Sequence, residues 1–136
     1  MPRAWRLLLQ VALFLPLFVG YWYVHHRLAL WMLWLPEMFS ELEWRKAGLL
    51  ASTVLCGLFA GMLFALPVRW VFPRRSVLAA AVIALLVVLF DLMHLRLSGA
   101  LTFTKVTFLL DFSALLLALP ASVALLRRLW PNQPAR

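Results

Sequence analysis

The sequence is poor in acidic residues and in cysteine. Asp and Glu account for 5 of its 136 residues, and charged residues of both signs for 13%, about half the share found in ordinary soluble domains. A soluble chain this short would have too few polar groups to cover its surface. The single cysteine, Cys56, excludes an intrachain disulfide and a CxxC redox pair, and with them a dithiol oxidoreductase.

Familiar catalytic patterns are also missing. The sequence contains no HExxH motif, no glycine-rich phosphate loop and no recognisable Ser/His/Asp arrangement. The formal net charge of +8 does not indicate nucleic-acid binding, because the Lys and Arg residues stand in short groups between apolar stretches. We therefore expect a protein that is not an enzyme, binds no nucleic acid and carries no cofactor.

Apolar residues dominate the chain. They make up 65% of it, and the mean hydropathy is +0.94. A helix needs about 20 mainly apolar residues to cross a bilayer, and four stretches qualify, at about 7–24, 48–68, 76–95 and 106–126. The sequence thus predicts one all-α integral membrane domain, a bundle of four transmembrane helices that contacts the lipid bilayer.

The first apolar stretch has some features of a signal peptide, because Arg3 and Arg6 precede it. However, the bulky residues Tyr21, Trp22 and Tyr23 stand where a cleavage site needs small ones. We therefore expect this stretch to remain as a membrane anchor.

Residues 28–39 form a shorter apolar stretch between the first two spans. They are too few to cross a bilayer, Pro36 interrupts them, and acidic residues follow. This favours an interfacial or re-entrant segment on the outer face. The alternative is a long first helix that runs through Trp34, which places His25, His26 and Arg27 in the membrane at considerable cost. At the other end of the chain, 131–136 is expected to be a short tail.

The positions of Lys and Arg predict the orientation, because short cytoplasmic loops are enriched in both. With the N-terminus inside, eight basic residues lie on the cytoplasmic side and five outside. The inner group is Arg3, Arg6, Arg69, Arg74, Arg75, Arg127, Arg128 and Arg136, and the outer group is Arg27, Arg45, Lys46, Arg96 and Lys105. We expect both termini in the cytoplasm, and a bacterial inner membrane as the location.

Tryptophan supports this topology, because its amphipathic ring prefers the headgroup level. All seven tryptophans fall near the ends of predicted spans. The four-span topology predicts Trp5, Trp70 and Trp130 at the inner interface, and Trp22, Trp31, Trp34 and Trp44 at the outer one.

Small residues recur every four positions in the second span. Gly57 and Gly61 belong to one row, and Ser52 and Cys56 to the neighbouring one. Small side chains at this spacing let another helix approach closely. The pattern predicts a packing face, used either inside the bundle or in contact with another chain.

Three ionisable residues in the last two spans are the strongest candidates for a functional site. Asp91 and His94 share a helix face, and the topology brings Asp111 to a similar depth. Together with Thr107 and a nearby Arg96, they predict one outward-facing polar cluster. Two roles fit this pattern. One is structural, in which these groups neutralise one another, and the other is a proton or cation pathway.

A metal site is a weaker alternative. His25, His26 and His94 all lie on the outer side, and carboxylates are near. Their spacing is not that of a known metal motif, and adjacent histidines point about 100° apart on a helix. We therefore predict no bound metal.

Residues 90–102, Phe-Asp-Leu-Met-His-Leu-Arg-Leu-Ser-Gly-Ala-Leu-Thr, end one span and lead into the next. This segment faintly resembles the membrane anchors of sulfatase-like lipoteichoic-acid synthases and phosphoethanolamine transferases. The resemblance covers 13 of 136 residues and does not extend to the metal site or the threonine nucleophile of those enzymes. It implies at most an anchor, and we assign no family from it.

Two functional hypotheses follow. The first is a non-catalytic accessory or structural subunit that binds another membrane protein, or its own copies, through the small face of the second span or the aromatic outer segment. The second is a small oligomeric transporter or proton- or cation-coupled channel that uses the outward-facing Asp/His cluster.

Overall fold

The computed structural model describes residues 3–32, 34–38, 40–98 and 105–131, and the side chains of 4–32, 34–38, 40–94 and 109–131. Within these ranges every regular element is an α-helix. The helices are α1 (Arg3–Trp31), α2 (Trp34–Glu37), α3 (Leu42–Val71), α4 (Ser76–Ser98) and α5 (Lys105–Leu129). This confirms the all-helical prediction, and four of the helices are long and apolar enough to cross a membrane.

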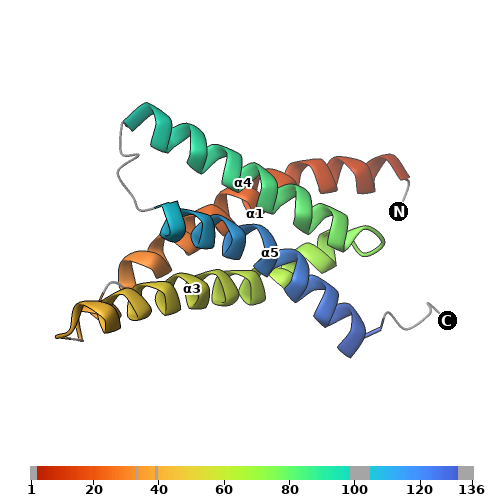
Figure 1. Ribbon diagram of the computed structural model, residues 1–136. Helices are drawn as coiled ribbons and strands as arrows, with labels where there is room; N and C mark the ends of the chain where they lie inside the picture. Colours follow the sequence, from red (N-terminus) through yellow and green to blue (C-terminus); the bar gives the residue numbers. More distant parts are fainter. Residues whose placement is uncertain (1–2, 33, 39, 99–104, 132–136) are drawn as a thin grey trace.

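The four long helices run alternately in opposite directions (Figure 1). The start of α1, the turn between α3 and α4, and the end of α5 lie at one end of the bundle, on the right of Figure 1. The closest pair of helices is α3 and α5, α4 packs on α5, and α1 crosses to contact both α3 and α4. We call the end that carries the two termini the terminal end, and the other the distal end.

The structure extends the first helix into residues 28–39. The first helix does not end near Val24 but continues unbroken to Trp31, so the start of the expected interfacial segment belongs to α1. Only one helical turn, α2, follows it. No helix breaker stands between Val24 and Trp31, and Arg27 is accommodated because its Nε donates to the Tyr23 hydroxyl at 2.9 Å. Of the predicted tail at 131–136, all but Pro131 lies outside the described residues.

Small residues place α3 directly against α5. The buried face of α3 includes Gly57 and Gly61, which lie opposite Ala114 and Ala118 of α5. A Cβ on Gly61 would lie 2.7 Å from the carbonyl carbon of Ala118, so only glycine allows the two backbones to come this close. The small-residue face of the second span is therefore covered within the chain.

The neighbouring row of small residues is also buried. Ser52 and Cys56 lie inside the bundle. The Ser52 hydroxyl donates to the carbonyl oxygen of Leu49 at 2.8 Å, which satisfies a polar group that faces an apolar interior. These residues complete the packing face that the four-residue spacing predicts.

The core is apolar and the outer surface is apolar as well. Val68, Ile83, Val87, Leu115 and Leu119 are fully buried. Many leucines on the outside of the helices are 40–65% exposed, among them Leu8, Leu63, Leu78 and Leu117. A surface of this kind is unfavourable in water and favourable in hydrocarbon, which is consistent with a membrane protein.

Replacing Gly61 with alanine should destabilise the bundle by about 1–3 kcal/mol, because the new methyl group would push the α5 backbone away. Thermal unfolding in mild detergent measures the effect. Gly20→Ala is the control, since its Cβ would meet only the tip of the Phe64 ring, at 2.9 Å, and a ring can turn aside. Equal melting temperatures for the two variants would contradict the close α3–α5 contact.

Candidate functional site

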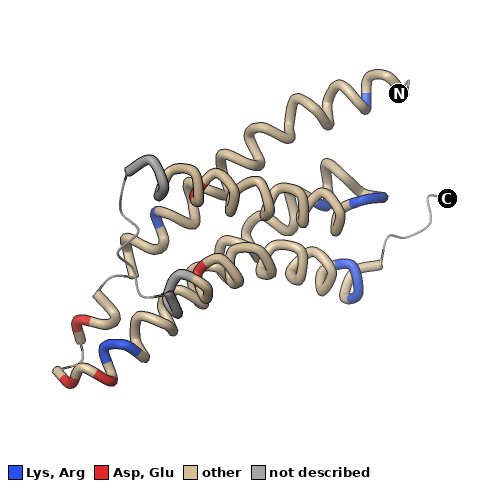
Figure 2. Tube along the Cα trace, turned by 45° about the horizontal axis from the view of Figure 1, so that its top comes forward, with Lys and Arg blue, Asp and Glu red and all other residues tan. Residues whose placement is uncertain are grey.

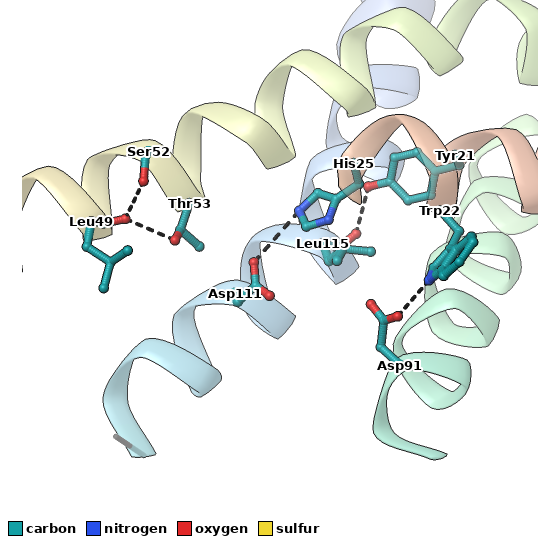
Figure 3. Close-up of polar contacts among 9 residues, drawn as sticks. All are labelled: Tyr21, Trp22, His25, Leu49, Ser52, Thr53, Asp91, Asp111 and Leu115. Carbon is teal, nitrogen blue, oxygen red and sulfur yellow. Dashed lines mark hydrogen bonds and ion pairs between the residues drawn. The ribbon is translucent and has the colours of Figure 1, made fainter. Parts of the chain in front are cut away.

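Three residues of α1 bring polar groups into the distal half of the bundle. Tyr21 and His25 are four positions apart and share one face of the helix, and Trp22 lies beside them. Figure 3 shows all three pointing toward α4 and α5, where Asp91 and Asp111 lie. The five residues form what we call the polar centre.

Asp91 of α4 pairs with Trp22 of α1. The indole Nε1 donates to Oδ1 of Asp91 at 2.7 Å (Figure 3), and the carboxylate is only 8% exposed. The Trp22 ring also packs edge-on against Phe90, with centroids 5.4 Å apart. A buried carboxylate needs such a donor, because its desolvation is otherwise uncompensated.

Asp111 of α5 faces His25 of α1. The Nε2 atom of His25 lies 3.7 Å from Oδ1 of Asp111, a distance within ion-pair range but beyond a hydrogen bond. The histidine side chain is 3% exposed and the aspartate side chain 44%. Neither ring nitrogen of His25 has a hydrogen-bond partner among the described residues.

Tyr21 fixes the position of α1 relative to α5. Its hydroxyl donates to the carbonyl oxygen of Leu115 at 2.9 Å, and the side chain is fully buried (Figure 3). Leu115 follows Asp111 by one helical turn, so this bond holds the His25 ring at the level of the Asp111 carboxylate.

The structure brings together some of the residues that the sequence singled out. Asp91 and Asp111 lie on neighbouring helices at a similar level, near enough for their charges to interact. His94 is exposed and within electrostatic reach of Asp91. The side chains of Arg96 and Thr107 lie outside the described residues, so their part in the cluster stays a prediction.

Sequence reasoning named His25 of α1 only as a weak metal candidate and missed the contribution of Tyr21 and Trp22 to this centre. Six of the seven tryptophans are 55–76% exposed, whereas Trp22 is half-buried and turned inward. The sequence predicts Trp22 at the outer interface and does not indicate that its N–H group binds a buried carboxylate. The signal that was available is the pair Tyr21 and His25, two polar residues on one face of an otherwise apolar helix.

The three histidines do not gather around one point suited to a metal ion. His25 is buried, whereas His26 and His94 are exposed. Among the described residues, no group of three or more His, Cys, Asp or Glu side chains is arranged to hold a metal. Proton exchange is the chemistry open to the centre itself, because imidazole and carboxylate groups both bind protons near physiological pH when their surroundings allow it.

Comparison with known proteins finds no matching family model, no matching curated protein and no matching solved structure.

Replacing Trp22 with phenylalanine should lower stability by about 1–3 kcal/mol, because it leaves the buried Asp91 carboxylate without its donor. Thermal unfolding in mild detergent measures the loss. Trp31→Phe, at a position that is 75% exposed, serves as the control and should leave the melting temperature nearly unchanged. A Trp22→Phe variant as stable as the wild type would argue against the interhelical bond.

Proposed function

We propose that this protein is a non-catalytic accessory subunit of a membrane complex. The observation that carries the proposal is the exposure of the first half of α1. Leu13 and Phe14 are partly buried against the core, whereas most of the large side chains in this half are exposed. The exposed ones are Trp5, Leu7, Leu8, Leu9, Val11 and Leu15. In Figure 2 this half of α1 stands apart from the other helices.

Few contacts hold this half of α1 to its own bundle. Gln10 donates to the carbonyl oxygen of Val71 at 3.0 Å, and Phe14 packs edge-on against Phe72 with centroids 6.4 Å apart. In hydrocarbon, helices associate through close packing and not through burial of apolar surface from water. A helix half without such packing is suited to contact a second membrane protein.

The apolar terminal half of the bundle also favours a subunit over a conduit. The polar centre lies toward the distal ends of α4 and α5. From there to the terminal end the described core is mainly apolar, and its fully buried polar residue, Ser76, is not ionisable. This stretch includes Val68, Ile83, Leu119 and Val123, all fully buried. A proton or ion would have no relay through these side chains within one copy.

The proposed docking of α1 can be tested by photo-crosslinking in the native membrane. A photoreactive residue at Leu8, which is 62% exposed, should join the chain to one protein partner of fixed mass. The same residue at Leu63 of α3, which is 61% exposed, should join only lipid. Native mass spectrometry after mild extraction should give the partner at fixed stoichiometry. A monodisperse monomer, with lipid adducts alone at both positions, would contradict the proposal.

The arginine-rich terminal end is proposed to face the cytoplasm of a bacterial inner membrane. Figure 2 shows basic residues without acidic ones at this end and acidic residues beside basic ones at the distal end, where Lys46 pairs with Glu43. The enrichment of Lys and Arg in cytoplasmic loops supports this orientation. The polar centre would then lie in the outer half of the membrane.

A second candidate function is proton or cation transport by an oligomer. The polar centre favours it, because ionisable groups inside membrane proteins commonly mark ion pathways. The apolar terminal half counts against a pathway through one copy, so transport would need a route between copies.

Transport predicts proton or cation flux into vesicles reconstituted with the protein. Asp91→Asn and Asp111→Asn should each reduce that flux at least about tenfold if the carboxylates carry the ion. The transport function would be excluded if vesicles with protein leaked no faster than empty ones. It would also be excluded if the folded Asn variants had unchanged flux.

A further inference from the structure

We propose that His25 and Asp111 form a proton-binding site that draws α1 and α5 together at the distal end of the bundle when it is occupied. One proton, taken from water, adds to Nε2 of the neutral imidazole and is shared with Oδ1 of Asp111. The inference does not depend on the accessory function, since it concerns a site within one chain.

The two side chains lie slightly beyond hydrogen-bond distance. At 3.7 Å, Nε2 and Oδ1 are too far apart to hydrogen-bond, and a movement of less than an ångström brings them within the range of about 2.7–3.2 Å. His25 is 3% exposed and both its ring nitrogens lack a partner among the described residues. A polar ring is rarely buried without any bond, so the arrangement indicates that a ligand completes it.

In this proposal the proton enters from the distal end. Asp111 lies on the same face of α5 as Leu115 and Ala118, which are both buried in the core. Its side chain is nevertheless 44% exposed. The carboxylate is therefore the part of the pair that the core does not enclose, and the proposed route does not cross the terminal half.

The surrounding charges favour Asp111 as the partner of His25. On α4, Asp91 already accepts a hydrogen bond from Trp22. His94, three residues further along α4, is exposed. On α1, His26 adjoins His25 with ring centroids 6.3 Å apart, while Arg27 is held by Tyr23. On α3, the facing titratable group is the buried thiol of Cys56. The side chains of Arg96 and Lys105 lie outside the described residues.

Protonation should strengthen the hold of α5 on α1. In the described structure, the hydrogen bond between these two helices runs from Tyr21 to Leu115. A charged imidazole beside an ionised carboxylate adds a second link, one turn further along α1, and the pair is neutral as a whole. Burial opposes an isolated charge on His25, so the proton is retained only while Asp111 faces the ring.

The test is a pH titration of the full-length protein in lipid nanodiscs, with the histidine rings labelled with ¹⁵N. His25 is assigned by the signal lost in His25→Gln. We expect its ring to bind a proton on acidification, within the pH range over which the protein stays folded. In Asp111→Asn the midpoint should fall by at least about one pH unit, a tenfold weaker binding. Asp91→Asn, the matched control, should shift it less, and Asp111→Glu should restore it.

A second measurement reports the movement of the helices. Spin labels at Leu30→Cys of α1 and Leu109→Cys of α5, both exposed positions, are attached in a Cys56→Ser background. Acidification should shorten the distance between the labels in this protein and leave it unchanged when His25→Gln is added. Any of three results would overturn the proposal. They are a His25 ring that binds no proton in this range, an Asp111→Asn midpoint equal to that of the wild type, and a label distance independent of pH.

Discussion

The close contact between α3 and α5 is the constraint on which the rest of the structure depends. Gly57 and Gly61 let the two backbones approach until a single added methyl group would strike the α5 main chain. This contact fixes the position of α5, and α5 in turn carries Asp111 and the Leu115 carbonyl that binds Tyr21. In hydrocarbon, where burial of apolar surface gives no gain, such steric fit replaces the hydrophobic effect as the source of specificity.

The first helix is joined to this frame by apolar packing and by polar contacts in its distal half. Tyr21 binds a carbonyl of α5, Trp22 binds a carboxylate of α4, and His25 faces a carboxylate of α5. Most large side chains of its other half are exposed. Under the proposed function, one helix serves two purposes, because its distal half builds the polar centre and its first half is available to a partner.

Much of the fold could be predicted from the sequence because membrane helices obey a length rule. The second, third and fourth predicted spans each lie within one helix, α3, α4 and α5. The first helix runs beyond its predicted span, and the prediction judged the cost of carrying His25, His26 and Arg27 in the membrane for isolated side chains. The structure lowers that cost by giving Arg27 the Tyr23 hydroxyl and by turning His25 toward Asp111. Likewise, Asp91 and Asp111 were correctly grouped by depth, whereas the inward turn of Trp22 was missed.

The sequence by itself determined the solvent, the number of candidate spans and the row of small residues, since these follow from composition and from spacing along one helix. Only the tertiary structure decided which residues meet across helices. The rotation of α1 about its own axis aims Tyr21, Trp22 and His25 at their partners, and that rotation is set by packing against α3 and α4 and not by any local pattern. The spacing of residues along α1 shows which of them share a face, but not which helix that face meets, and the hydrogen bonds across helices distinguish the partners of Tyr21 and Trp22.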